Sequence, residues 1–353
     1  MKNYKIAMIA GDGIGKEVVP AGRHVLDTAA RRFGFALDWR AFDWGCDYYG
    51  VTGRMMPEDG ITTLREYDAV FFGAVGWPTV PDNISTWDLI LRIRQELGLY
   101  IGLRPVRLMP GIRSPLANRG PGDIDMMIVR ENSEGEYSNA GGRLFVGTEN
   151  ELAIQEAVFT RRAIDRVLRY GFELARTRRR RLSLATKSNA IKFAMPLWDE
   201  RLEAIARDYP DISTDKYHID ILCAKFVSEP NRFDVIVASN LFGDILSDLG
   251  PAVAGSIGIA ASANIDPTRA APSMFEPVHG TAPDIAGKGV ANPVGQISAG
   301  AMMLDHLGET AAAGAVVRAI EKVLADGTAL TSDLGGGAST LEAASAIANA
   351  IEE

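Results

Sequence analysis

The sequence predicts an α/β protein with a largely parallel sheet, because short apolar strands and amphipathic helices alternate along most of the chain. Its 353 residues are more than one hydrophobic core usually serves, so we expect two domains, with the second inserted in the first because no linker marks a boundary. With 47% hydrophobic and 23% charged residues, the composition is that of a globular protein rather than a disordered or fibrous one.

The strands are predicted from short apolar runs and from alternating segments. They are Lys5–Ala10, Phe35–Ala41, Ala69–Phe72, Ile124–Val129, Leu182–Thr186, Ile219–Leu222 and Val235–Ala238. Helical spacing of apolar residues predicts the helices Lys16–Arg32, Glu58–Glu66, Trp87–Leu97, Thr160–Arg176, Pro196–Arg207 and Leu241–Leu249. The segment Asn139–Glu151 is rich in glycine and asparagine, which fits either a protruding hairpin or an ordinary surface loop.

Charge and cysteine content exclude several classes of protein. A net charge of −8 argues against a nucleic-acid binder and means that an anionic substrate needs a local cluster of arginines. The run Arg176–Arg181 could bind an anion, but a single run in an acidic chain favours the solvated end of a helix. Cys46 and Cys223 form no C-x-x-C pair, so neither a disulfide framework nor a zinc site is expected. No apolar stretch is long enough for a secretion signal or a membrane span, which predicts a cytoplasmic protein.

A glycine-rich loop follows the first strand but does not complete a dinucleotide fingerprint. The segment Gly11–Glu17 reads G-D-G-I-G-K-E, whereas the fingerprint G-x-G-x-x-G needs glycine where this chain has Lys16. Asp12 would also place a negative charge where a pyrophosphate approaches. We therefore interpret the loop as a tight turn between strand and helix, and not as a Rossmann site.

Paired carboxylates predict a metal site. Asp244 and Asp248 lie four residues apart, so they share one face of the helix predicted there, where like charges repel. A hard cation such as Mg²⁺ or Mn²⁺ offsets that repulsion. The alternative is a solvated acidic face of the helix, but the apolar residues beside the two aspartates argue against it. Asp220 is a candidate third ligand of the metal.

Three arginines are candidates for binding a diacid. Arg94 and Arg104 flank the segment 95–103, and Arg130 ends the strand predicted at Ile124–Val129. Arginine binds carboxylates with two parallel hydrogen bonds. A single arginine is more often part of a surface ion pair, so this hypothesis requires that all three meet in space.

These motifs resemble the β-decarboxylating dehydrogenases, the family of the isocitrate and 3-isopropylmalate dehydrogenases. The similarity runs nearly end to end and is most specific in two segments. The matching segments are Gly11–Val18, Phe72–Pro78, Leu103–Arg107, Val129–Asn132, Thr186–Asn189, His218–Cys223, Ser239–Asp248 and His279–Gly287, of which the last two are the most specific. Gly76-Trp77-Pro78 and His218–Cys223 are most similar to the branch that acts on D-malate and tartrate.

The resemblance implies a fold and a reaction. The fold is the two-domain isocitrate/isopropylmalate dehydrogenase fold, with residues 1–99 and 253–353 forming a large domain. Residues 100–252 form an inserted small domain with the dimer contacts and an arm at about residues 138–157. The implied reaction is NAD-dependent, metal-dependent oxidation and β-decarboxylation of a small 2-hydroxy dicarboxylate, with D-malate or tartrate as substrate. The alternatives are a 3-isopropylmalate dehydrogenase and a non-catalytic metal-binding homologue.

The resemblance also implies residue roles. Tyr137 and Lys187 correspond to the acid/base pair, and a cation near the tyrosine would lower its pKa. The carboxylate-binding residues are Arg94, Arg104 and Arg130, and the metal ligands are Asp220, Asp244 and Asp248. The cofactor-binding residues are His279, Gly280, Ala282, Pro283, Asp284 and Asn292. Lys187 and Asp220 would enter the partner's site in a homodimer, and the resemblance leaves open whether a monovalent cation takes part.

Two departures from the family concern the substrate pocket. Close relatives usually have asparagine where this chain has Gly102, and they have Leu-Trp-Gly where it has Thr86-Trp87-Asp88. Trp87 lies seven residues before Arg94, which on an α-helix places both on one face. The indole could therefore fill the space that a branched 3-alkyl malate would need; the alternatives are a core residue that faces away from the pocket and a residue that packs against the nicotinamide.

Overall fold

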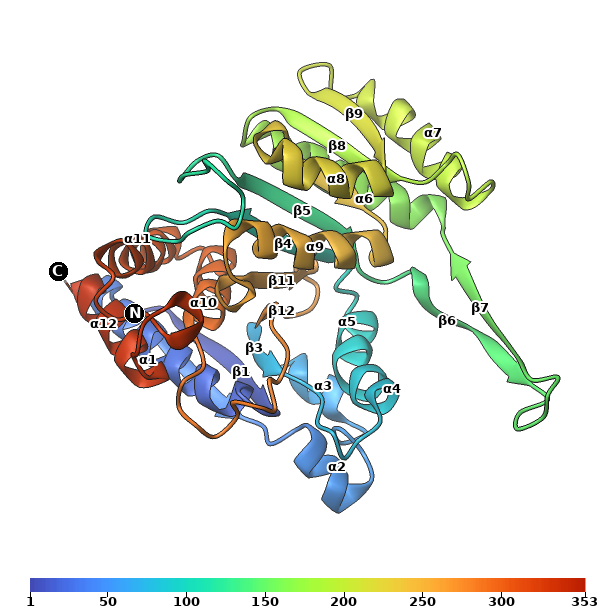
Figure 1. The fold of residues 1–353 in the computed structure, drawn as a ribbon. Coiled ribbons are helices and arrows are strands. Elements are labelled where there is room, and N and C mark those ends of the chain that lie inside the picture. Colours follow the sequence, from blue (N-terminus) through green and yellow to red (C-terminus); the bar gives the residue numbers. More distant parts are fainter. Residues whose placement is uncertain (353) are drawn as a thin grey trace.

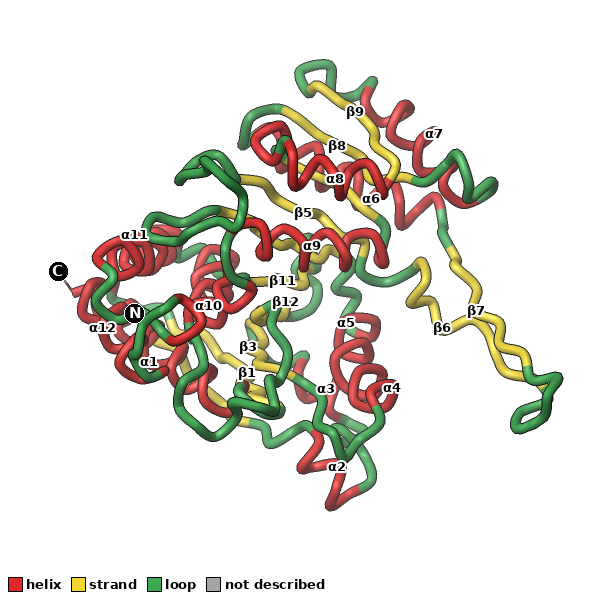
Figure 2. The backbone as a smooth tube through the Cα atoms, viewed as in Figure 1, coloured by secondary structure: helices red, strands yellow, loops and turns green. Residues whose placement is uncertain are grey.

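The computed structural model describes residues 1–352 of the chain, which form one ten-stranded mixed sheet, a separate hairpin and helices on both faces of the sheet (Figures 1 and 2). The strands are β1 Asn3–Gly11, β2 Ala36–Ala41, β3 Ala69–Ala74, β4 Ile101–Arg107, β5 Asp125–Glu131, β6 Gly135–Leu144, β7 Leu152–Val158, β8 Arg181–Thr186, β9 Ser213–His218, β10 Val235–Ala238, β11 Ala261–Ile265 and β12 Ser273–Pro277.

The longer helices cover the sheet and the shorter ones lie between strands. They are α1 Gly15–Phe33, α2 Cys46–Thr52, α3 Gly60–Leu64, α4 Asp82–Ser85, α5 Arg92–Glu96, α6 Arg161–Arg176, α7 Ala194–Ala206, α8 Ile219–Ser228, α9 Asn240–Ala254, α10 Val294–His306, α11 Thr310–Asp326 and α12 Thr340–Glu352. A π-helical segment, Thr86–Leu91, joins α4 to α5. No helix among the described residues is both long and apolar enough to cross a membrane.

The sheet has two halves that meet at an antiparallel centre. Its strand order is β2-β1-β3-β12-β11-β4-β5-β10-β8-β9. Six pairings are parallel and three are antiparallel, and the antiparallel ones join β12, β11, β4 and β5. Strands from residues 3–74 and 261–277 form one half, and strands from residues 101–238 form the other. The division into domains at residues 99/100 and 252/253 stays a prediction.

Strand β3 shows how the sequence fills both faces of the sheet. All six of its residues are buried, as expected of a continuous apolar run in a central strand. Ala69 and Phe71 pack into the core beneath α1 and α10, whereas Val70 and Phe72 pack into a second core near α2 and α5. Helices from both ends of the chain, α1 and α12, therefore lie side by side on one face (Figure 1).

The glycine- and asparagine-rich segment is a hairpin that extends away from the rest of the molecule (Figure 1). Strands β6 and β7 pair antiparallel only with each other, and every residue of β7 is exposed. Several large apolar side chains of the hairpin are exposed, among them Phe145 at 63%, Val146 at 65% and Ile154 at 47%. The structure thus supports the hairpin over the ordinary loop.

One predicted strand is wrong. Ile219–Leu222 is the first turn of α8, and the strand is β9, which directly precedes it. Leu222 and Phe226 are buried while Ile221 is exposed, which is helical spacing. A four-residue apolar run does not distinguish a strand from a helix turn, and the helical period appears only with the residues that follow.

Helix α9 approaches the sheet closely through glycines on one face. A Cβ atom on Gly243 would lie 2.7 Å from the Cβ of Arg130, and one on Gly250 would lie 2.5 Å from the Cγ2 of Val106. These glycines are seven residues apart and face β5 and β4 respectively. Their lack of side chains sets the distance between α9 and the two strands.

We predict that Gly243→Ala and Gly250→Ala each destabilise the protein by about 1–3 kcal/mol, because the added methyl must displace α9 from the sheet. Gly50→Ala is the matched control, since it lies in α2 with nothing within 4 Å of its Cβ position. Thermal unfolding of the three variants and the wild type provides the comparison. Unchanged melting temperatures for both α9 variants would contradict the close packing.

Candidate active site

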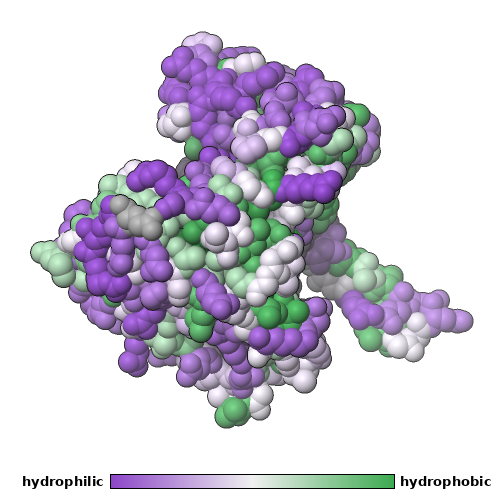
Figure 3. Space-filling view, turned by 60° about the vertical axis from the view of Figure 1, so that its left-hand side comes forward, coloured by the Kyte–Doolittle hydropathy of each residue, from purple (hydrophilic) through white to green (hydrophobic). Residues whose placement is uncertain are grey.

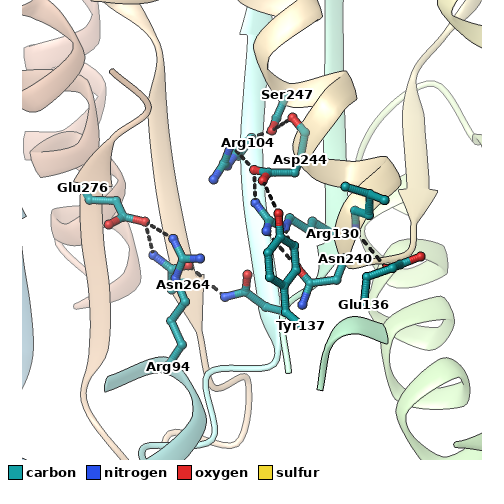
Figure 4. A network of polar contacts seen from close by, with 12 residues as sticks. Arg94, Arg104, Arg130, Glu136, Tyr137, Asn240, Asp244, Ser247, Asn264 and Glu276 are labelled. Carbon is teal, nitrogen blue, oxygen red and sulfur yellow. Dashed lines mark hydrogen bonds and ion pairs between the residues drawn. The ribbon is translucent and has the colours of Figure 1, made fainter. Parts of the chain in front are cut away.

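The three arginines expected to bind a diacid meet in one pocket of about 230 Å³. Arg94 comes from α5, Arg104 from β4 and Arg130 from β5, and their side chains lie near one another although they come from separate elements (Figure 4). All three are buried, with exposed fractions of 5%, 8% and 3%. Tyr137 and Asp244 line the same pocket. The condition that all three arginines meet in space is therefore fulfilled, and their binding of a diacid stays a prediction.

Asp244 lies at the centre of the polar contacts in this pocket. Its carboxylate pairs with Arg130, lies 3.6 Å from Arg104 Nη1 and accepts a 3.1 Å hydrogen bond from the Tyr137 hydroxyl. Burial acts to raise the pKa of Asp244, but the positive charges of Arg130, Arg104 and Arg94 outweigh it and hold the pKa below its usual value. Asp244 is therefore ionised at neutral pH.

The guanidinium groups of Arg104 and Arg130 have neutral partners as well. Arg130 donates to Asn240 Oδ1 from Nε at 3.0 Å and from Nη2 at 2.7 Å, and Arg104 donates to Ser247 Oγ at 2.5 Å. Asn240, Asp244 and Ser247 follow one another at helical spacing along α9 and face the strands (Figure 4). Burial lowers the pKa of Arg130 to about 10, which leaves the group charged.

Arg94 has its own carboxylate partner, a residue that sequence reasoning missed. Glu276, at the end of β12, accepts a hydrogen bond of 2.6 Å from Arg94 Nη2, and both side chains are buried. Asn264 donates to the same Glu276 oxygen at 2.8 Å and accepts a 2.8 Å hydrogen bond from Asn132. Glu276 lies three residues before His279, so its position beside the cofactor motif was the available signal.

Within one chain, without the lysine expected from a partner, the pKa of Tyr137 is raised and not lowered. Burial raises its pKa first, the charge of Asp244 raises it further, and the nearby Arg130 only partly offsets this. Lys187, the cation expected beside it, does not line the pocket; its Nζ lies 2.8 Å from Asp220 Oδ1 instead. The resemblance assigns Lys187 to the partner's site, so its separation from Tyr137 within one chain agrees with that assignment, and its effect on the pKa of Tyr137 stays a prediction.

The expected metal ligands are only partly brought together. Asp244 and Asp248 lie one turn apart on α9, and Asp248 has neither a hydrogen bond nor an ion pair with any described residue. Burial and the charge of Asp244 raise the pKa of Asp248, with Arg104 acting in the opposite direction. Within residues 1–352 no group of three His, Cys, Asp or Glu side chains could hold a metal ion, so Asp220 does not join them. Two adjacent carboxylates still suit a hard divalent cation.

The expected cofactor loop packs against the glycine-rich loop. A Cβ on Gly13 would lie 2.1 Å from the Thr281 carbonyl oxygen, and the Ile14 amide donates to that oxygen at 2.9 Å. The buried Asp12 accepts hydrogen bonds from the amides of Cys46 at 2.8 Å and Gly76 at 2.9 Å. The turn is thus filled by protein groups, which agrees with the interpretation of a tight turn rather than a Rossmann phosphate site.

The loop from His279 to Asn292 is anchored at several points and still has free binding groups. Glu17 accepts hydrogen bonds from the amides of Gly287 at 2.5 Å and Gly289 at 2.8 Å. The Nε2 atom of His279 is buried and has no hydrogen-bond partner among the described residues. Burial lowers the pKa of His279, so the ring is neutral. An unpartnered ring nitrogen fits contact with a nucleotide base.

The remaining loop residues have varied environments. Pro283 and Asp284 are exposed, Gly280 is exposed with open space at its Cβ position, and Ala282 has a φ of +42°. Asn292 is buried, and its Nδ2 donates to Asp333 at 3.0 Å while its Oδ1 accepts from the Val294 amide at 3.0 Å. His279 and Gly280 also line the arginine pocket, which joins the two regions.

Trp87 does not line the pocket, contrary to the sequence expectation. The pocket-facing residues before Arg94 are Thr86, Ile90 and Leu91. Thr86–Leu91 is π-helical, so each residue turns through a smaller angle than in an α-helix. The face of Arg94 is therefore continued four and eight residues earlier, at Ile90 and Thr86, and not seven residues earlier.

The arginine run is explained by structural ion pairs. Arg176 lies 3.1 Å from Asp211, and Arg178 lies 2.8 Å from both Asp125 and the fully buried Asp234. These contacts tie the end of α6 to the start of β5 and β10. They support the interpretation of a helix end over an anion-binding surface.

Comparisons with known proteins identify the family of the chain. The family model described as isocitrate/isopropylmalate dehydrogenase matches residues 5–351. The chain is 58% identical to the D-malate dehydrogenase [decarboxylating] of Escherichia coli (strain K12) over 359 aligned positions, which cover 99% of each chain. It is 55% identical to the tartrate dehydrogenase/decarboxylase of Pseudomonas putida, covering 99% of this chain and 98% of the relative.

The similarity extends to the solved structures. The isocitrate dehydrogenase from Methylococcus capsulatus superposes with a TM-score of 0.90 at 36% identity, covering 99% of this chain and all of that one. The fold expected from the motifs is thereby confirmed. The chain belongs to the isocitrate/isopropylmalate dehydrogenase family and is an enzyme of this decarboxylating oxidoreductase class.

Proposed function

We propose that this protein oxidises and decarboxylates a small 2-hydroxy dicarboxylate, either D-malate or tartrate, with NAD and with Mg²⁺ or Mn²⁺. The observation that carries the proposal is the meeting of Arg94, Arg104 and Arg130 with Asp244 and Tyr137 in one pocket. The names of relatives more than 50% identical over nearly the whole chain support D-malate and tartrate as substrates. The alternative, a 3-isopropylmalate dehydrogenase, would use the same arginines.

The arginines bind and orient the dianion. Their five N–H donors each are suited to paired hydrogen bonds with carboxylates, and burial strengthens the attraction to a charged ligand. Arg104 and Arg130 lie on adjacent antiparallel strands, while Arg94 reaches the pocket from the opposite half of the sheet. One carboxylate is bound by the strand pair and the other near α5, which fixes the hydroxyl-bearing carbon between them.

Asp244 and Asp248 would hold the divalent cation, and the loop from His279 to Asn292 would hold the adenosine end of NAD. When bound, NAD supplies the hydride acceptor and the cation supplies a Lewis acid for the hydroxyl and carboxylate oxygens of the substrate. Tyr137 carries its proton at neutral pH and would deliver it to the product after CO₂ leaves, a transfer that the pKa-raising charge of Asp244 opposes until that carboxylate binds the cation.

Two expected site residues do not line the pocket of their own chain, which supports a homodimer with shared sites. Lys187 and Asp220 are paired with each other outside the pocket, so one partner would deliver both to the other's site. Exposed apolar side chains lie on the hairpin and on helices α8 and α9, where Ile221, Val227 and Ile245 are each 45–48% exposed. Figure 3 shows hydrophobic side chains on the hairpin among hydrophilic ones. Such surfaces are typical of protein interfaces.

The direct test of the proposed function is steady-state kinetics with NAD and Mn²⁺ on D-malate, tartrate and 3-isopropylmalate. We expect the highest kcat/KM on D-malate or tartrate, with one pyruvate formed per D-malate oxidised. Preference for 3-isopropylmalate would establish the alternative. Absence of turnover on every 2-hydroxy dicarboxylate would refute the proposal.

We predict that Asp244→Asn and Asp248→Asn each weaken Mn²⁺ binding and abolish turnover, because each removes a charged oxygen ligand. Calorimetric titration with Mn²⁺ measures the affinity. The control is Asp326→Asn, an exposed aspartate of α11 that does not line the pocket. Wild-type Mn²⁺ affinity in both α9 variants would remove the metal assignment.

The loop also predicts a preference for NAD over NADP. The exposed carboxylate of Asp284 can accept hydrogen bonds from ribose hydroxyls, and its charge would repel a 2′-phosphate. We expect Asp284→Asn to narrow the ratio of kcat/KM values for the two coenzymes by about tenfold, which corresponds to about 1.4 kcal/mol. An unchanged ratio would show that Asp284 does not lie beside the ribose.

The π-helical segment makes a prediction about substrate size. Ile90→Ala should enlarge the pocket beside Arg94 and shift the kcat/KM ratio toward 3-isopropylmalate by about 10- to 200-fold. Trp87→Ala is the matched control and should leave that ratio near the wild-type value, because the indole does not line the pocket. The opposite pattern would mean that the bound complex adopts α-helical spacing at this segment.

A further inference from the structure

In the ligand-free chain, the groups assigned to the cation and to the substrate bind each other. Asp244, the expected metal ligand, pairs with Arg130 and lies 3.6 Å from Arg104, which are the expected substrate arginines. Its second oxygen accepts the hydroxyl of Tyr137 at 3.1 Å. Neither ligand can make its full set of contacts until these pairs separate.

The arrangement allows exchange of partners because the arginines have other anchors. Asn240 accepts two hydrogen bonds from Arg130, and Ser247 accepts one from Arg104. After loss of Asp244, each guanidinium therefore still has a neutral acceptor on α9 that can hold it. An incoming carboxylate could replace that of Asp244 without rebuilding the site.

Two neighbouring groups carry the same charges as Arg130 and Asp244 but do not take part in the ion pair between those residues. Arg94 is a pocket arginine whose partner is Glu276 and not Asp244. Asp248 is an aspartate on the same helix that pairs with no described residue. They provide internal controls, because each contributes a similar charge without taking part in the Asp244 contact.

We propose that Asp244 occupies the place of a substrate carboxylate in the empty site, so that dicarboxylate and divalent cation bind with positive coupling through exchange at the Asp244–Arg130 pair. The inference rests on the proposed function for the identity of the two ligands. A dicarboxylate that takes Arg130 releases Asp244 for the cation, and a cation that takes Asp244 releases Arg130. By linkage, each ligand increases the affinity for the other by the same factor.

Two opposite consequences follow for the single ligands. Arg130→Gln should leave Asp244 with only its longer contact to Arg104 and its hydrogen bond from Tyr137, and should raise the affinity for Mn²⁺ alone by about tenfold, within the usual range of coupling between sites. Asp244→Asn should leave Arg130 and Arg104 without a charged partner, with only Asn240 and Ser247 as neutral acceptors, and should raise the affinity for D-malate alone by a similar factor. Arg94→Gln and Asp248→Asn remove charges of the same sign without breaking the Asp244–Arg130 pair, so they should change these affinities less.

The test is calorimetric titration of metal-free protein without NAD, using MnCl₂ and D-malate separately as probes. Arg130→Gln is compared with Arg94→Gln for Mn²⁺, and Asp244→Asn with Asp248→Asn for D-malate. We expect about a tenfold gain in the first member of each pair and a change of less than about threefold in the second. If either pair shows equal affinities, the exchange is refuted.

Further outcomes distinguish a failure of the exchange from misfolding of a variant and from failure of the proposed function. If Arg130→Gln does not fold, the Asp244 and Asp248 comparison decides alone, because those side chains are partly solvent-accessible. If wild-type protein binds neither probe, alone or together, the proposed function fails. If both probes bind but the paired variants do not differ, only the exchange fails.

Discussion

The structure depends on the burial of three guanidinium groups where the two halves of the sheet meet. Isolated buried charges cost several kcal/mol each, so the chain must provide compensating anions and hydrogen-bond acceptors. Two carboxylates pair with the three cations: Asp244 with Arg104 and Arg130, and Glu276 with Arg94. The pocket therefore retains one net positive charge from these five groups, which favours the binding of an anionic substrate.

The surrounding fold serves this charge cluster. The antiparallel centre of the sheet brings β4 and β5 beside β11 and β12, so residues from both halves reach one pocket. Gly243 allows α9 to approach β5 closely enough for Asn240 and Asp244 to contact Arg130. Figure 4 shows these contacts as two groups, one around Glu276 and one around Asp244. A displacement of α9 would change the distances in the second group.

Sequence patterns predicted elements with a long helical periodicity of apolar residues, such as α1, and elements with a clearly bounded apolar run, such as β3. They failed at Ile219–Leu222 and at Trp87, because local spacing does not reveal a helix turn hidden in an apolar run or a π-helical segment. The arginines were identifiable by residue type, but only tertiary structure could bring them together. Glu276 was not predicted, because no sequence pattern marks a buried carboxylate that pairs with an arginine far away in the sequence.

The central claim is that one chain provides the arginine pocket while its partner provides Lys187 and Asp220. The most direct measurement is the activity of a hybrid dimer, isolated with two different tags, that joins one Lys187→Ala subunit to one Asp244→Asn subunit. Shared sites predict that the hybrid regains about half of the wild-type activity although both parent dimers are inactive, because one of its two sites is then complete. A hybrid as inactive as its parents would show that each chain relies on its own Lys187, and would contradict the account.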